Sequence, residues 1–297
     1  MKYGIREICE VVFKAKNNMK VGNKLFYKHE PVIYFDSLKT STLEGAATTV
    51  YATGGRGNSR LIAWEGERTV TFTMEDALIS TVGIAILTGA GVIGATTGKP
   101  IIQHMTQRTT VGADGVITLE YKPYSKSGED FIYVMKLDST GDMASEPYLY
   151  IAGSDNTITI KTENYTADEN KPVEGDVVLV DYYTEKTEKM LQIEITPDKF
   201  GGNFYVEAST LFRDTDGVDR AAEFVIPNAK VQSNFNFAMA SSGDPSTFTF
   251  TLDAFPDYTR FDQTKKVYCA IQVEDELDVT DKNNDKVRTS TDAGAEF

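Results

Sequence analysis

Apolar and polar residues alternate with a period of two in several segments that lie far apart in the sequence. In Arg68 to Glu75, for example, Val70, Phe72 and Met74 alternate with threonines. This period places apolar side chains on one face of a β-strand and polar ones on the other, as in an antiparallel sheet with one face in water. The sequence therefore predicts a mainly β fold. The other segments with this pattern are Lys189 to Thr196, Asn234 to Met239, Thr247 to Asp253 and Val267 to Glu274.

One segment interrupts the β pattern and is predicted to form an α-helix from near Thr73 to Gly89. Glu75 and Asp76 would lie in its first turn, where carboxylates complement the positive end of the helix dipole. The apolar run over residues 77–93 is shorter than the roughly 20 residues that a helix needs to cross a bilayer, so no membrane insertion is expected. The apolar residues with helical spacing, which would pack on the sheet, are Leu78, Val82, Ala85 and Ile86.

The rhythm of the strands changes between residues 94 and 188, where short strands are separated by Gly, Asp, Asn and Pro turns. This rhythm is typical of a small β-sandwich. We therefore expect residues 1–93 and 189–273 to form one antiparallel β-barrel or sandwich core with a packed helix, and residues 94–188 to form an inserted β-sandwich-like domain. Residues 274–297 hold eight acidic and three basic side chains and are expected to form an acidic C-terminal arm. The strands expected in the insert are Gly115 to Tyr121, Phe131 to Leu137, Tyr148 to Ala152, Thr157 to Thr162 and Asp176 to Tyr183.

The formal net charge is −14, which excludes a protein that grips nucleic acid through a basic surface. The two cysteines, Cys9 and Cys269, lie in neither a CxxC motif nor a Cys/His cluster with metal-ligand spacing. We expect both thiols to be reduced. The first residues show no apolar segment of the kind found in a signal peptide, so the chain is expected to be cytoplasmic when it is made.

No motif in the sequence indicates an enzyme or a cofactor. Of the two histidines, His29 lies in a predicted strand, where a structural role is expected. The glycine-rich segment Thr53 to Asn58 has neither the Lys-Ser/Thr of a Walker A loop nor a surrounding βαβ unit, and it fits the tip of a hairpin. Asp214 to Asp219 lacks the ligand spacing of an EF-hand and is predicted to form an Asp-Gly turn.

Two segments carry a resemblance to a known family. Residues 54–87, GGRGNSRLIAWEGERTVTFTMEDALISTVGIAIL, resemble the glycine loop, paired strands and helix of a class of phage virion proteins. Residues 224–257, FVIPNAKVQSNFNFAMASSGDPSTFTFTLDAFPD, are similar to the closing strands of the tail tube proteins of contractile-tailed phages. The family is normally shorter, and the block at 94–188 would be an elaboration of it.

The resemblance implies a structural subunit that forms hexameric rings, stacked into a tube through which DNA travels without specific binding. It implies contacts with tail sheath, tape measure and baseplate proteins, assembly in the host cytoplasm and a final place in the virion tail. Six copies at −14 each carry a formal −84 per ring. Such a charge suits a conduit that must not hold the phosphate backbone.

Two sets of residues are therefore candidates for function in such a tube. The glycine loop would contact the next ring, because glycine permits backbone angles that other residues resist. The wet faces of two strands lack Lys and Arg and would line the bore, although alternation alone leaves the exterior of the tube equally open. The loop residues are Gly54, Gly55, Arg56, Gly57 and Asn58. The candidate bore residues are Gln192, Glu194, Thr247, Thr249, Thr251 and Asp253.

Two other classes of protein fit the same sequence. A baseplate or tail-surface protein could use exposed aromatic residues between Tyr121 and Tyr133, and at Tyr182 and Tyr183, to recognise a glycan or another virion protein. A capsid or decoration protein would also be a β-rich shell component. Electron microscopy of the purified protein separates the three classes. A tail tube protein would form tubes, a baseplate or tail-surface protein would remain monomeric, and a capsid or decoration protein would form spherical shells.

Overall fold

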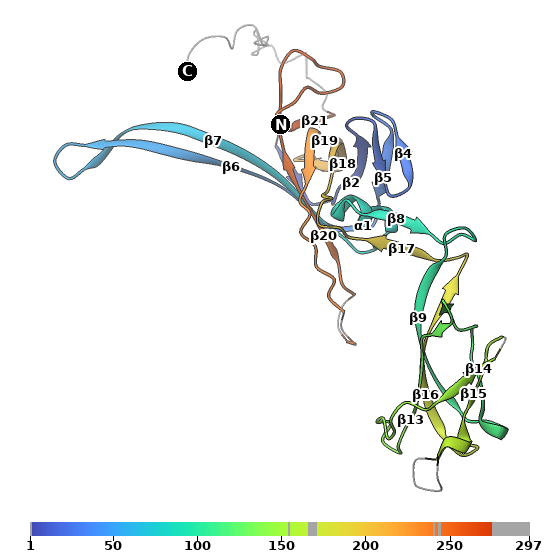
Figure 1. The fold of residues 1–297 in the computed structure, drawn as a ribbon. Helices are drawn as coiled ribbons and strands as arrows, with labels where there is room; N and C mark the ends of the chain where they lie inside the picture. The colour runs from blue at the N-terminus through green and yellow to red at the C-terminus, as the bar shows by residue number, and fades with distance from the viewer. Residues whose placement is uncertain (1, 154, 166–170, 240, 243–244, 275–297) are drawn as a thin grey trace. The chain divides into compact units, whose positions relative to one another are not determined.

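The computed structural model describes residues 2–153, 155–165, 171–239, 241–242 and 245–274 (Figure 1). The chain divides into two compact units, the first formed by Met1–Gly91 and Ile195–Phe297 and the second by Val92–Glu194. The sequence pattern placed the breaks at 93/94 and 188/189. The expected acidic arm, except for Glu274, lies outside the described residues.

The first unit is built on a nine-stranded antiparallel sheet. Seven strands follow one another in the order β5-β2-β18-β19-β20-β7-β6, while β1 pairs with β18 and β21 pairs with β19. The path of hydrogen bonds is open, with β5 and β6 at its edges. The bounds are β1 (Tyr3–Ile5), β2 (Glu10–Ala15), β5 (Pro31–Phe35), β6 (Leu38–Gly54), β7 (Ser59–Asp76), β18 (Asn203–Asp214), β19 (Asp219–Val231), β20 (Phe248–Ala254) and β21 (Ala270–Val273).

Aromatic rings fill the core of this unit. Phe13 of β2 is fully buried, and its ring centroid lies 5.1 Å from that of Phe35 and 5.4 Å from that of Phe204. Phe35 at one edge of the sheet also contacts Phe250 of β20, with centroids 5.1 Å apart. The sheet therefore curls so that β5 packs over β20, and the alternating apolar residues of these strands face one another.

Most of the alternating segments are strands, but one is not. Arg68 to Glu75 lies within β7, Thr247 to Asp253 matches β20, and β21 covers the middle of Val267 to Glu274. The predicted strand Asn234 to Met239 is wrong, because no strand is assigned there. Phe235 and Phe237 do lie on the same side, with centroids 5.4 Å apart, but their backbone has no ladder of hydrogen bonds.

The predicted strand around His29 is also interrupted. A short hairpin, β3 (Met19–Val21) and β4 (Lys24–Phe26), precedes a turn that contains His29 at φ 70°, and β5 begins only at Pro31. The backbone N–H of His29 donates to the carbonyl of Ala15 at 2.7 Å. A turn rather than a straight strand therefore carries this histidine.

The helix is shorter than predicted and begins later. Within the described part of the chain, α1 (Thr81–Thr88) is the single α-helix. Ser80 is its N-cap and accepts a hydrogen bond from the N–H of Gly83 at 2.9 Å, while Gly89 ends it at φ 70°. The carboxylate of Asp76, expected in the first helical turn, instead lies at the end of β7 and accepts from Ser37 Oγ at 2.5 Å.

The strand pairing explains where β7 gives way to the helix. Thr73 and Glu75 pair with Thr251 and Thr249 of β20, so the ladder extends β7 up to Asp76. Of the apolar residues assigned to the packed side of the helix, Ala85 and Ile86 are buried, Val82 is at the surface, and Leu78 lies before the helix and is 69% exposed.

The predicted Asp-Gly turn joins β18 to β19. The carboxylate of Asp214 accepts hydrogen bonds from the N–H groups of Asp216 and Val218, both at 2.9 Å, and from Arg220 Nε at 3.1 Å. The bond from Val218, together with Arg220, holds the pKa of Asp214 below its ordinary value of 3.8. Gly217 takes φ 84°, which completes the turn.

Replacing Asp214 by asparagine is expected to lower stability at neutral pH, because the neutral amide loses the ion pair with Arg220. A carboxyl group whose pKa is lowered by folding stabilises the fold above its ordinary pKa, and this contribution is lost as the pH falls through the lowered value. The difference in thermal midpoint between wild type and Asp214→Asn should therefore shrink below about pH 4. The exposed Asp216→Asn is the matched control, and a difference unchanged down to pH 2 would contradict this account.

The second unit contains two three-stranded antiparallel sheets that share one core. One has the order β13-β16-β9 and the other β10-β15-β14. All five strands expected in this region are present, and β9 was not foreseen. The strands are β9 (Ile101–Thr110), β10 (Val116–Thr118), β13 (Ile132–Lys136), β14 (Tyr150–Ala152), β15 (Thr157–Ile160) and β16 (Val177–Lys186). The largest of the fully buried side chains in the shared core are those of Tyr182, Ile117, Leu119, Ile158 and Ile160.

Two small sheets complete this unit. Short strands β11 (Ser125–Lys126) and β12 (Glu129–Asp130) form a hairpin, and β17 (Leu191–Glu194) pairs with β8 (Gly91–Gly94). The apolar face predicted for Lys189 to Thr196 is largely exposed in the structure: Leu191 and Ile195 are 56% and 52% exposed.

Among the helices of the described residues, none is long and apolar enough to span a membrane.

Candidate assembly surface

The hairpin formed by β6 and β7 extends away from the rest of its sheet as a two-stranded ribbon (Figure 1). β20 pairs with β7 only from Val70 to Asp76, whereas β6 and β7 remain paired with each other out to Gly54 and Ser59. Nearly every residue from 44 to 69 is exposed, with Ala52 and Gly54 half-buried. From Ala46 to Gly54 the ribbon extends about 27 Å, at roughly 3.4 Å per residue.

One face of the ribbon is apolar. Val50 pairs with Trp64 and Ala52 with Ile62, and residues directly opposite each other share a face. Leu61 lies beside Gly54, where a Cβ would be 3.3 Å from Leu61 Cδ1, so the bulge at this point keeps Leu61 on the same face. Val50, Leu61, Ile62 and Trp64 are 61%, 64%, 54% and 53% exposed. We call these four residues the apolar ribbon face.

The opposite face of the ribbon is polar. The guanidinium of Arg60 lies over the ring of Tyr51, 4.0 Å from its centroid, and Thr49 pairs with Glu65. At the second bulge, near Gly66, the side chain of Thr48 fills the space beside the glycine, since a Cβ on Gly66 would lie 2.5 Å from Thr48 Oγ1. The ribbon therefore presents one apolar and one polar surface.

The predicted contact loop forms the tip of this ribbon. Gly54 pairs with Ser59, and between them Gly55, Gly57 and Asn58 have φ values of 76°, 89° and 50°. The N–H of Asn58 donates to the carbonyl of Gly55 at 3.1 Å and closes the turn. Left-handed angles of this kind are open to glycine and tolerated by asparagine, which explains the composition of the loop. Arg56 stands exposed at the tip.

The candidate bore residues fall into two groups in different sheets. Gln192 and Glu194 lie on β17, where Gln192 Nε2 donates to Glu194 Oε1 at 3.0 Å. Thr247, Thr249 and Thr251 line a hollow of about 520 Å³ beside residues 234–238, so their face is not a flat surface. Asp253 accepts from Gln232 Nε2 at 2.9 Å.

The two cysteine thiols are not activated as nucleophiles. Cys9 and Cys269 are free, and burial raises the pKa of both thiols, that of Cys269 to about 11. Thiols of this kind stay protonated at neutral pH and are poor nucleophiles. Within the described part of the chain, no group of His, Cys, Asp or Glu side chains could hold a metal ion.

The sequence indicates the tip of the ribbon through its glycines, but it does not distinguish the apolar face. The signal was present, because Val50 and Ala52 alternate on one strand and Ile62 and Trp64 on the other. In the sequence this alternation is indistinguishable from that of a strand whose apolar face is buried in its own core. Only the structure shows that, among the described residues, no third strand pairs with the ribbon at these positions.

A mainly antiparallel β fold with a long uncovered ribbon is typical of a subunit that assembles with others. The model of the YomU/Tube protein family matches residues 6–269, and the chain belongs to this family. The match agrees with the resemblance to phage tail tube proteins and makes the chain a structural tail tube protein rather than a member of an enzyme family. No curated protein matches the chain.

Proposed function

We propose that this chain assembles into stacked hexameric rings that form the tail tube of a phage, and that the apolar ribbon face packs on a neighbouring copy. The uncovered ribbon is the observation that supports this best. A two-stranded hairpin is at most marginally stable alone in water and needs a further strand or a packed face. Within the described residues the chain covers neither face of the ribbon, so a second copy supplies what is missing.

The tip of the ribbon then carries the contact between rings. Gly54, Gly55, Arg56, Gly57 and Asn58 lie at the end of the ribbon, far enough from the sheet of their own unit to reach another subunit. The polar ribbon face, with Arg60 stacked on Tyr51, stays in water or contacts another virion protein such as the sheath. Tape measure and baseplate proteins are the further partners of such a tube.

Imaging of the purified protein tests this function. Negative-stain electron microscopy at rising protein concentration should show tubes of uniform bore built from six-fold rings. Monomers at every concentration would favour a surface-binding protein, and spherical shells would favour a capsid or decoration protein. Either of these results would overturn the proposal.

The proposed bore surface can be tested by adding positive charge. Thr249 is exposed and Thr251 is half-buried at the edge of a hollow, so lysine at both positions should leave the fold intact. Twelve new cations in each six-subunit ring would attract the phosphates of passing DNA. Particles with Thr249→Lys and Thr251→Lys should assemble but eject DNA more slowly, and salt should relieve the defect. Normal ejection at low salt would place this surface outside the bore.

A further inference from the structure

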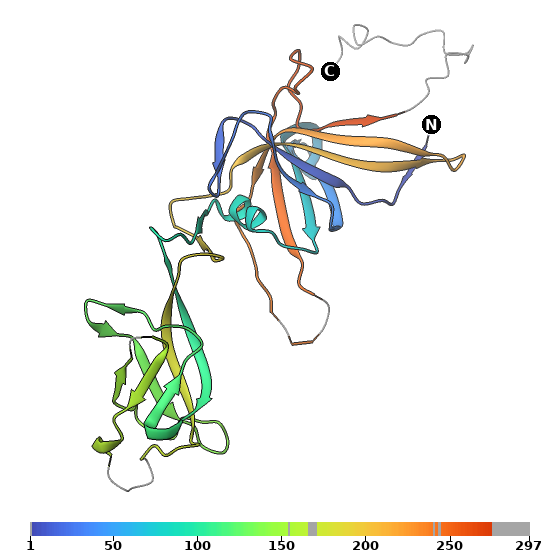
Figure 2. The same cartoon turned by 90° about the vertical axis from the view of Figure 1, so that its right-hand side faces the viewer.

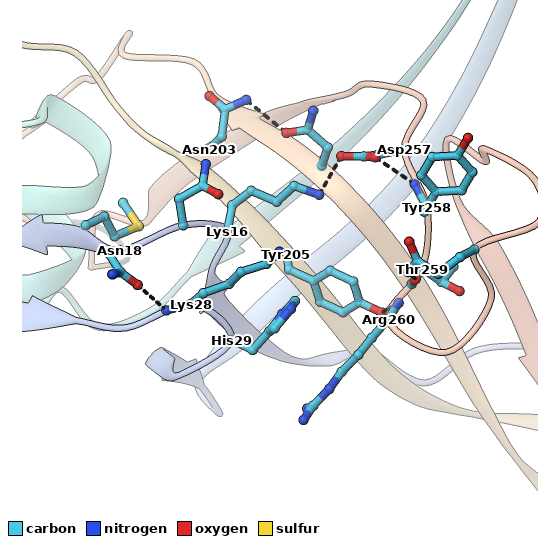
Figure 3. A pocket seen from close by; sticks show the side chains of 14 residues that line it. Lys16, Asn18, Lys28, His29, Asn203, Tyr205, Asp257, Tyr258, Thr259 and Arg260 are labelled. Carbon is cyan, nitrogen blue, oxygen red and sulfur yellow. Dashed lines mark hydrogen bonds and ion pairs between the residues drawn. The ribbon is translucent and has the colours of Figure 1, made fainter.

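A cleft of about 790 Å³ opens in the first unit where β2 ends and β18 begins (Figure 3). Lys16, Lys28 and Arg260 contribute its positive charges, and Asp257 is the one carboxylate among its lining residues. The remaining polar lining is mostly amide, including Asn203 and Asn228, whose side chains hydrogen-bond at 2.9 Å. A chain of net charge −14 thus carries a locally cationic cleft.

Two of these cations are available to a ligand. Lys16 Nζ lies 2.6 Å from Asp257 Oδ2, which pairs that lysine with the one carboxylate. Within the described residues, neither Lys28 nor Arg260 forms an ion pair. The guanidinium of Arg260 lies 5.5 Å from the centroid of the Phe261 ring and extends away from the other lining side chains in Figure 3. An arginine and a lysine without ion-pair partners line the same cleft as several amide side chains, and these are the donors that recognise a carboxylate.

His29 lies in the cleft among several cationic side chains. Burial and then the cations of Lys28, Arg260, Lys16 and Lys14 lower the pKa of this histidine. Its buried Nδ1 atom has no hydrogen-bond partner among the described residues, and its backbone is held at φ 70°. A bound anion would offset the repulsion that these cations exert on one another.

The last described strand, β21, shows on which side of the first unit the acidic C-terminal segment begins. β21 runs antiparallel to β19, and the N–H of Glu274 donates to the carbonyl of Ala221. The cleft lies at the other end of β19, at Asn228, about 23 Å away along the strand. Figure 2 shows β21, in orange-red, pointing along β19 towards the turn between β18 and β19, and thus away from the cleft.

We propose that the cationic cleft binds the acidic segment 274–297 of a second copy of this chain. This segment has eight acidic and three basic side chains, and its first residue, Glu274, lies at the end of β19 opposite to the cleft. In a stack of copies that all point the same way, the end of one subunit meets the opposite end of the next, which is a heterologous contact. The inference rests on the proposed self-assembly, to which it adds a second contact between subunits.

The test uses a fluorescein-labelled peptide with the sequence of residues 274–297 and the full-length protein. Fluorescence anisotropy at low salt should show binding, and binding should weaken as salt screens the charges. Lys28→Gln combined with Arg260→Gln should raise the dissociation constant by about tenfold or more. The matched control, Lys99→Gln with Lys126→Gln, removes two exposed lysines of the second unit and should bind like wild type.

Three results would overturn the inference. These are no binding of the peptide at low salt, equal binding by the cleft variant and the control variant, and equal binding of a peptide whose acidic residues are replaced by Asn and Gln. Displacement of the peptide by millimolar inorganic phosphate would also overturn it, in favour of a general anion site. Tubes that form although the peptide does not bind would refute this inference alone and leave the proposed function standing.

Discussion

Replacing both Leu61 and Trp64 by serine is expected to raise the protein concentration needed for tube formation by at least about thirtyfold. The two side chains are 64% and 53% exposed in the subunit, and burying that area on a neighbour would contribute about 2–4 kcal/mol. The subunit itself should fold normally, because neither side chain belongs to its core. The measurement is the fraction of protein that sediments as tubes over a range of concentrations.

The control for this experiment removes exposed apolar area elsewhere. Leu149 and Ile151 of the second unit are 55% and 56% exposed, so Leu149→Ser with Ile151→Ser is closely matched in exposed apolar residues. This control variant should assemble like wild type. If both double variants lose assembly equally, the effect is general solubility rather than a specific contact, and the ribbon has no special role.

Replacing Phe13 by alanine should lower the free energy of unfolding of the first unit by about 3–5 kcal/mol. Phe13 is fully buried and contacts the rings of Phe35 and Phe204, which belong to two other strands of the sheet. The lost side chain leaves a cavity that the surrounding strands can fill only in part. Because the chain has two units, a single unfolding midpoint would mix their contributions.

Hydrogen exchange followed by mass spectrometry separates these contributions. Peptides from β2 and β18 should lose protection in Phe13→Ala, while peptides from β16 in the second unit should keep theirs. Leu25→Ala, at a position that is 55% exposed, should change neither set. Equal loss of protection in both units would show that they unfold together, contrary to this prediction.

Strands with a buried face could be predicted from the sequence because their chemistry is local. In β7 and β20 most apolar residues of the alternation are buried in the core, as Phe72, Met74, Phe250 and Leu252 are. The turn at Asp214 could likewise be predicted, since Asp and Gly specify the backbone angles of the turn themselves. Period and turn chemistry thus predicted the mainly β class and most of its elements.

The features that could not be predicted depend on pairing between strands that are distant in the sequence. The residues after Thr73 have acidic and apolar side chains that suit a helix, but β20 pairs with them and extends the strand. Asn234 to Met239 alternates like a strand, yet no strand is assigned there and Met239 is 92% exposed. Periodicity states which side chains share a face and leaves open whether a partner strand is present.

The same limit applies to the proposed assembly surface. The glycines predict the loop at Gly54 to Asn58. The alternation of the apolar ribbon face, in contrast, is the same as that of a strand with a buried face, and only the fold shows that the chain does not cover it. The cationic cleft was also missed, because Lys28 and Arg260 are far apart in the sequence. Strand pairing and the loop after β20 bring them together.

The fluorescence of Trp64 tests the central claim most directly, because it is the one tryptophan of the chain and lies on the apolar ribbon face. In the subunit its side chain is 53% exposed, so the emission should be that of a solvated indole and acrylamide should quench it readily. In assembled tubes the emission should shift to shorter wavelength and the quenching should fall, since a neighbouring copy covers the ribbon. Tubes whose Trp64 emits and is quenched as in the subunit would contradict the account.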